Sequence, residues 1–265
     1  MATAKKTPAT KADDGGEIVI TRINEQTFDV HIVGTSPLIM NQFAKKSWRE
    51  LLLPAKKKTT ATKEASLKHD PVQEFNEAAY VMRDKDAPTL LAVLPTAFKK
   101  SLMTAALDIP GAKKTQIGRL LSVSWDRTPL WGTPKLHMSM VRMADMKRTP
   151  DVRTRVIIPE WACVLTITFP TPTLNATSVA NLVHAAGRYA GVCEWRQEKG
   201  SGSFGSFRMC ETGKNDPEFK RIVATGGRKA QIDAMEAHTA YDDDTAELLS
   251  WYEAEVRRRG MKAVA

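Results

Sequence analysis

The stretch AGRYAGVCEWRQEKGSGSFGSF, residues 186–207, decides how the fold of this sequence is interpreted. A predicted helix ends at Gly191, a loop with closely spaced glycines follows, and a strand is predicted at Ser206–Cys210. Glycine permits left-handed backbone angles and a close approach to a partner. Exposed amides and basic side chains in such a loop can hold phosphates. A flexible glycine–serine connection between two elements is the alternative.

Regular elements are predicted on either side of this loop. Val156–Phe169 predicts one strand, because the odd-numbered residues from Trp161 to Phe169 are all apolar, and Gln26–Gly34 alternates in the same way. Asn175 or Thr177 can cap the helix that precedes the loop. Other helices are predicted at 42–52, at 71–82 and from Pro95, a strand at 89–94, and strand-like pieces between 120 and 155.

This order of elements favours an α+β fold. We expect a ferredoxin-like or RNA-recognition-type antiparallel sheet with long insertions and a C-terminal helix. Residues 1–17 contain few apolar side chains and predict a disordered tail. Residues 18–212 predict the α+β domain, with mobile insertions near 55–70 and 135–155, and residues 213–265 predict a helical C-terminal extension.

Composition and charge restrict the classes of function. The chain has 265 residues, a net charge of +9 and a pI near 9.5, so it is expected to attract polyanions, of which nucleic acid is the commonest large one. No apolar run is long enough to cross a bilayer, and the N-terminus has no secretory signal. Three widely spaced cysteines predict a reducing compartment and no zinc site. These features predict a cytoplasmic protein without membrane association, cofactor or metal.

The loop also carries a resemblance to a known family. Residues 186–207 resemble the glycine-rich loop of the RAMP superfamily, the ferredoxin-fold proteins of CRISPR effector complexes. LPTAFKKSL, residues 94–102, is similar to a helix start in the backbone-subunit branch of that family. The pattern also looks like phage proteins with a GIGEWRP-like segment before a GxxGxF ending, from which Cys193 and Gln197 depart. The resemblance covers roughly residues 26–210 and implies subunits that polymerise along a single strand.

We therefore expect a sequence-independent single-stranded nucleic-acid-binding protein that forms an oligomer or a filament. Its strand could be DNA or RNA, because backbone contacts alone do not distinguish them. Basic side chains are expected to contact phosphates, glycines to admit the backbone, and aromatic rings to stack on bases. The predicted binding residues are Lys56, Lys57, Lys58, Lys99, Arg142, Arg153, Arg155, Trp195, Arg196, Lys199, Gly200, Gly202 and Phe204.

Catalysis is not predicted. None of the five histidines (His31, His69, His137, His184 and His238) has a neighbouring nucleophile or carboxylate at a spacing typical of a triad or a metal site. The acidic run Asp242–Asp244 predicts a helix start, where negative charge is favourable. Two alternatives remain. One is a viral assembly or host-defence-inhibiting module with a RAMP-like fold, and the other is a metal-independent ribonuclease.

Overall fold

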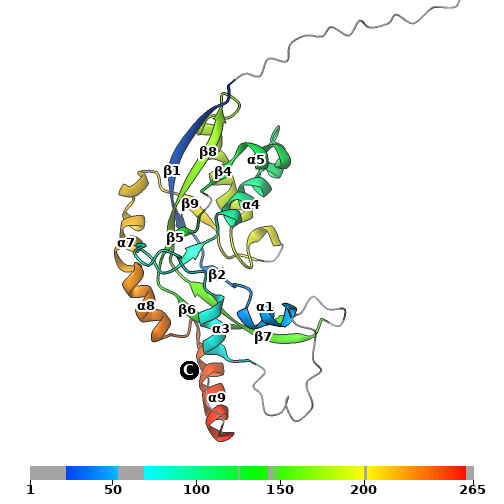
Figure 1. The fold of residues 1–265 in the computed structure, drawn as a ribbon, viewed down its shortest axis with the longest axis vertical. Coiled ribbons are helices and arrows are strands. Elements are labelled where there is room, and N and C mark those ends of the chain that lie inside the picture. Colours follow the sequence, from blue (N-terminus) through cyan, green and yellow to red (C-terminus); the bar gives the residue numbers. More distant parts are fainter. Residues whose placement is uncertain are drawn as a thin grey trace, which may run out of the picture.

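The computed structural model describes residues 22–52, 69–124, 126–142, 146, 148–199 and 202–260. Within these ranges the chain has an α+β fold with antiparallel sheets and a C-terminal helix (Figure 1). The expected tail at 1–17, most of the insertion at 55–70, and the predicted binding residues Lys56, Lys57, Lys58 and Gly200 lie outside the described residues.

The larger sheet is built around two long antiparallel strands. β1 (Asn24–Gly34) pairs with β8 (Ala162–Thr171) along almost its whole length, from Asn24 opposite Thr171 to Val33 opposite Ala162. The short strand β9 (Phe207–Met209) pairs with the other edge of β1. Beyond β8 lie β4 (Ser122–Val123) and β5 (Thr128–Trp131), and β3 (Ala92–Val93) pairs with β5.

Helices cover both faces of this sheet. α4 (Pro95–Ala105) and α6 (Ala176–Ala185) contact each other and bury one face, whose core includes Ile32 and Ile167. α7 (Pro217–Thr225) covers the other face, where Phe219 and Ile222 pack against Val33 (Figure 1). The strand order β5-β8-β1-β9, with α4 after β1 and α6 after β8, does not conflict with a ferredoxin-like unit.

A second, three-stranded sheet has the order β2-β7-β6. It contains β2 (Leu38–Met40), β6 (Lys135–Arg142) and β7 (Pro150–Ile158), and α3 (Pro71–Ala78) packs against β7. The expected mobile insertion at 135–155 is therefore corrected to a β-hairpin, held by the pairing of residues 135–142 with 150–157. The single strand expected at Val156–Phe169 is also corrected, because it is broken at residues 159–161 and its two parts join different sheets.

The C-terminal segment is docked against the rest of the fold. α8 (Arg228–Glu236) carries the fully buried Gln231, whose amide accepts from the backbone N–H groups of Leu90 and Leu91 and donates to three carbonyls, including Leu130 O at 2.7 Å. α9 (Asp243–Arg258) begins as expected at the acidic run, since Asp242 Oδ1 accepts from Thr245 N–H at 2.8 Å. No helix in the described part of the chain is long and apolar enough to cross a membrane.

Candidate nucleic-acid interface

The loop at 191–205 is closed by its own backbone hydrogen bonds. α6 passes through a π-helical turn at Ala186–Ala190 to Gly191, where φ is 68°. Val192 N–H donates to Gly205 O at 2.9 Å, and Phe204 N–H donates to Trp195 O at 3.1 Å. The two arms of the loop therefore lie against each other over most of the described length.

Two glycines are required by this closure. A Cβ at Gly202 would lie 1.9 Å from Trp195 O, and a Cβ at Gly205 would lie 1.9 Å from Val192 O. Gly205 also has a φ of 69°, which disfavours any residue with a side chain. Gly202, which we expected to admit a ligand backbone, is thus needed by the loop itself, although it also borders the hollow described next.

Four of the predicted binding residues meet at one place. Trp195, Lys199, Gly202 and Phe204 line an open hollow of about 240 Å³. The rings of Trp195 and Phe204 are half-buried, with centroids 5.9 Å apart and planes inclined by 52°. The hollow therefore has two aromatic walls and one exposed ammonium group at its edge.

The backbone beneath the aromatic walls adopts an uncommon conformation. Cys193 and Trp195 have positive φ values of 64° and 51°. Such residues persist only where surrounding contacts hold them, and they are enriched at functional sites. Burial raises the pKa of the Cys193 thiol to about 12, so this cysteine stays protonated and unreactive at neutral pH.

Arg155 contacts the Trp195 side of the hollow from within the protein. We expected it to contact phosphate, but its side chain is buried. Its Nε donates to Glu194 Oε2 at 2.6 Å, Nη1 donates to Ser139 Oγ at 2.9 Å, and the guanidinium carbon lies 5.0 Å from the Trp195 ring centroid. Arg155 is therefore corrected from a phosphate contact to a brace that positions Trp195.

Arg196 is also occupied within the chain. Its Nε donates to Glu198 Oε2 at 2.7 Å, and its Nη1 donates to Cys193 O at 2.8 Å. Burial acts to raise the pKa of Glu198, but hydrogen bonding from Arg196 and the positive charges of Arg196 and Lys199 outweigh it and lower that pKa. The phosphate contact at Arg196 stays a prediction, and a phosphate there would compete with the carboxylate of Glu198.

The remaining basic residues do not line the hollow. Lys99 is half-buried on α4, and Arg142 is exposed at the end of β6. Arg153 lies on β7 two residues before Arg155, with Nη2 3.4 Å from Asp151 Oδ2. Because side chains alternate along a strand, Arg153 shares a sheet face with Arg155, whereas Arg142 belongs to the opposite face of the hairpin.

Sequence reasoning missed a partly buried ionic cluster at His69. Its Nδ1 lies 2.7 Å from Glu74 Oε1 and its Nε2 lies 2.9 Å from Asp151 Oδ1. The hydrogen bond with Glu74 is the main cause of a raised His69 pKa, against the opposing effect of burial and with the help of Asp151. Glu74 was visible five residues downstream, but Asp151 comes from a distant strand. With both ring nitrogens bonded to carboxylates, His69 has no nitrogen left to abstract a proton from a substrate.

A second histidine lies beneath the aromatic wall. His137 is buried, its ring is 6.1 Å from that of Trp195 in an edge-on arrangement, and its Nδ1 is 3.4 Å from Asp242 Oδ2 without hydrogen-bond geometry. Burial is the main cause of its lowered pKa, which Asp242 opposes and the charge of Arg155 reinforces. His137 therefore favours the neutral form. Among the described residues, no group of three or more His, Cys, Asp or Glu side chains could hold a metal ion.

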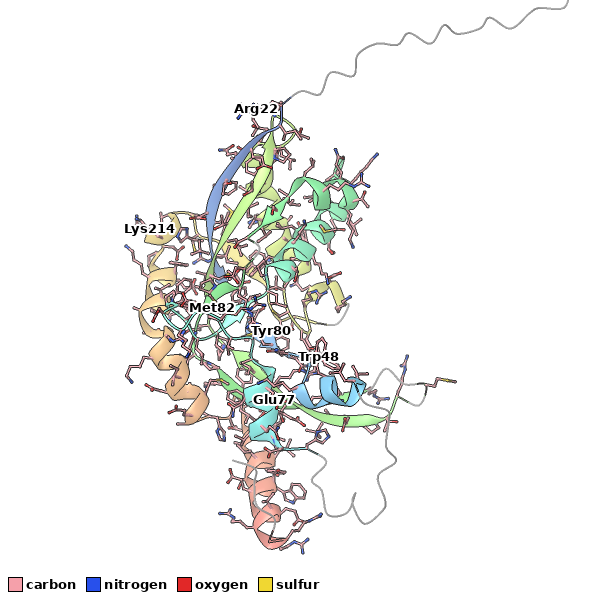
Figure 2. All side chains as sticks on the ribbon, in the orientation of Figure 1. Arg22, Trp48, Glu77, Tyr80, Met82 and Lys214 are labelled. Atoms are coloured by element: carbon pink, nitrogen blue, oxygen red, sulfur yellow. The ribbon has the colours of Figure 1, made fainter. Side chains whose placement is uncertain are left out.

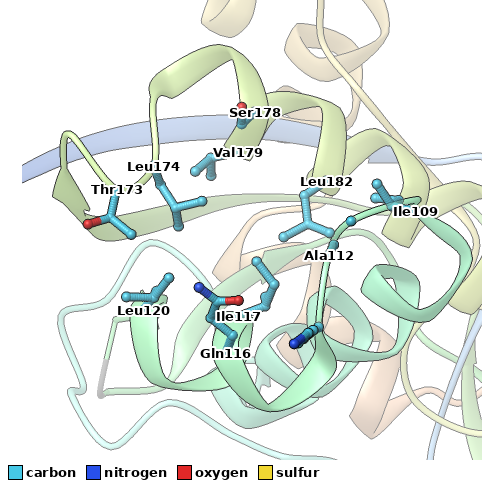
Figure 3. A pocket seen from close by; sticks show the side chains of 12 residues that line it. Ile109, Ala112, Gln116, Ile117, Leu120, Thr173, Leu174, Ser178, Val179 and Leu182 are labelled. Atoms are coloured by element: carbon cyan, nitrogen blue, oxygen red, sulfur yellow. The ribbon is translucent and has the colours of Figure 1, made fainter.

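A larger hollow lies elsewhere and contains none of the predicted residues. Figure 3 shows this space of about 300 Å³ between α5 (Lys114–Leu120) and α6, with apolar side chains such as Ile117, Leu174 and Leu182 turned into it. It lacks the combination of aromatic rings and cation found at Trp195. Size alone does not make it the better candidate site.

No protein-family model matches the chain, and no curated protein matches it in sequence. Function is therefore inferred from the chemistry of the residues in the hollow and around it.

Proposed function

We propose that this protein binds single-stranded nucleic acid without sequence preference, using the hollow bounded by Trp195, Lys199, Gly202 and Phe204. A base stacks against the two rings while the Lys199 ammonium group attracts the adjacent phosphate. Copies of the chain line up along the strand, in the cytoplasm of the cell or, for a viral protein, of its host. The role is binding without turnover.

The observation that carries this proposal is the pairing of two accessible aromatic rings with an available cation. Base–aromatic stacking contributes about 1–3 kcal/mol per base in proteins that bind single strands. Lys199 is exposed and has no carboxylate within ion-pair distance in the described part of the chain, whereas Arg155 and Arg196 both do. Lys199 is thus the basic residue of the loop with the least competition for its charge.

The same residues favour sequence independence. An aromatic face stacks on any base, and an ammonium group recognises a phosphate through charge. Directional contacts with base edges commonly use Asn, Gln, Asp, Glu or Arg side chains, and none of these is among the described residues that line the hollow. We therefore expect homopolymers of different bases to bind with similar affinity.

Binding of fluorescently labelled oligonucleotides, followed by anisotropy across a salt series, tests the proposal. Phe204→Ala is expected to weaken binding by about 1–3 kcal/mol through lost stacking. Lys199→Ala is expected to reduce the slope of log K against log salt by about 0.7, the value for one phosphate contact on a single strand. Lys214→Ala is the matched control, because Lys214 is also exposed but precedes α7 (Figure 2).

Three outcomes would contradict the proposal. These are no binding to either single-stranded DNA or RNA at low salt, binding that salt does not weaken, and equal effects of Lys199→Ala and Lys214→Ala. A purified assembly free of nucleic acid that binds no oligonucleotide would favour the protein-assembly alternative. Cleavage of labelled RNA would favour the ribonuclease.

A further inference from the structure

α1 (Lys45–Leu52) presents an apolar face that no other described helix or strand covers. Trp48, Leu51 and Leu52 are 59%, 75% and 81% exposed, and their spacing of three and four residues places them on one side of the helix. The ring of Phe43 lies 5.9 Å from that of Trp48 and extends this face. In the described part of the chain no other helix or strand packs extensively against α1 (Figure 2). Contiguous apolar surface of this kind is typical of an interaction site.

α9 presents a second uncovered face. Its buried side, including Thr245 and Val256, faces the rest of the protein, and Thr245 Oγ1 accepts from Met138 N–H on β6. On a neighbouring side, Leu248 and Trp251 are 41% and 64% exposed. The exposed residues Asp244 and Glu247 lie on the same side by helical spacing. In Figure 1 this helix extends from the end of the fold that carries α3.

The two faces are complementary in both polarity and charge. On α1, the exposed Lys45 lies three residues before Trp48 and therefore on the same side of the helix. The first three turns of α9, DDTAELLSWYE, contain four acidic residues and no basic one. Opposite charge around apolar contacts directs association and fixes register, and aromatic side chains commonly dominate the binding energy.

We infer that the α1 face of one copy packs against the α9 face of a second copy. Trp48 and Leu51 bury against Leu248 and Trp251, with Lys45 next to the acidic residues of α9. The occupant is a second copy because the chain itself supplies both surfaces, and α1 does not pack extensively against α9 of its own chain.

The two faces are different, so the contact is heterologous. A copy that uses its α1 face still has a free α9 face, and repetition of the contact produces a ring or an open filament instead of a closed dimer. This inference deepens the proposed function, since it names the surfaces through which copies would join along a strand. Its test uses no nucleic acid, so either proposal can fail without the other.

Sedimentation of the purified full-length chain over a concentration series, without oligonucleotide, provides that test. The unmodified protein should form assemblies that grow with concentration and weaken at high salt. Trp48→Asp and Trp251→Lys should each weaken self-association about 30-fold or more, as expected for aromatic anchors. Leu107→Asp, at a residue equally exposed but outside both faces, should leave assembly unchanged.

Mixing the two variants gives the decisive result. Each variant retains one intact face, so an equimolar mixture of Trp48→Asp and Trp251→Lys should form dimers and nothing larger. A monomer at every concentration for the unmodified protein, or no dimer on mixing two folded variants, would overturn the inference. Circular dichroism establishes that both variants are folded. If Trp48→Asp instead weakens binding of a short oligonucleotide and leaves assembly intact, α1 is a nucleic-acid surface and the inference is wrong.

Discussion

The guanidinium carbon of Arg155 lies 5.0 Å from the centroid of the Trp195 ring, which is part of the wall of the proposed binding hollow. The same guanidinium is hydrogen-bonded to Glu194, the residue before Trp195 in the chain. β7 and the loop are thus joined by one side chain that holds both the ring and its neighbour. A desolvated cation against an indole ring contributes about 2 kcal/mol in favourable cases.

Replacing Arg155 by Met should destabilise the protein by about 2–4 kcal/mol, because Glu194 loses its cationic partner and keeps only the Asn41 amide among its side-chain partners in the described residues, and because Trp195 loses the guanidinium that lies against its ring. The free energy of unfolding from urea titration measures this effect. Arg142→Met removes the same charge from an exposed position and should change that free energy by no more than about 0.5 kcal/mol. Equal stability of the two variants would show that Arg155 is not a brace.

Gln231→Met should destabilise the protein by about 2–4 kcal/mol. The buried amide accepts from two backbone N–H groups and donates to three carbonyls, and these bonds would be lost while Met fills a similar volume. The N–H groups of Leu90 and Leu91 would lose the Gln231 oxygen, whereas Gly226 O would keep its bond from Gly132 N–H. Thermal or urea unfolding measures the loss, and Gln26→Met, at an exposed position near the start of β1, is the control. Limited proteolysis should remove the C-terminal segment faster from Gln231→Met than from the unmodified protein. Equal rates of removal would contradict the role of Gln231 in attaching α8.

His69 should stabilise the fold more at acidic than at alkaline pH. Its folded-state pKa is raised above the ordinary 6.5, so its contribution is complete below that value and is lost as pH rises through the folded pKa. His69→Asn should therefore cost about 1–3 kcal/mol at low pH and progressively less above neutrality. Urea unfolding of both proteins at several pH values tests this. A cost that grows with pH would contradict it.

His137 should have the opposite effect. Its folded-state pKa is lowered, so the unfolded chain takes up a proton first and the fold loses stability as pH falls through 6.5. His137→Gln should remove this loss and flatten the pH dependence of the free energy of unfolding on the acidic side. His184, on α6 with an exposed ring, provides the matched control through His184→Gln. If His137→Gln leaves the pH dependence of the free energy of unfolding unchanged, the His137 ring does not cause the loss of stability at acidic pH.

Local patterns in the sequence predicted much of the fold. The alternation at Gln26–Gly34 corresponds to β1, Asn175 caps α6 as expected, and Asp242 begins α9. The break at 159–161 was missed because apolar residues continue on both sides of it, and alternation alone does not show that the two parts join different sheets. The hairpin at 135–155 was missed because its Met-rich, basic composition hid the pairing of two strands.

The candidate site could be predicted only in part, because some of its contacts join residues that are distant in the sequence. The aromatic and glycine residues of the loop are close in sequence, so their meeting at one hollow could be expected. The carboxylate with which each basic side chain pairs could not be predicted from the sequence. Arg155 pairs with Glu194 from a distant segment, whereas Lys199 has no such partner in the described residues. Charge counts along a sequence do not distinguish a paired guanidinium from an available ammonium group.

The tight packing of Gly202 and Gly205 limits how this protein can vary among its relatives. A methyl group at either position would collide with a carbonyl oxygen, whereas the exposed Ser203 between them meets no such limit. Homologues that keep this loop should therefore retain the Gly-x-x-Gly spacing while the intervening polar residue drifts.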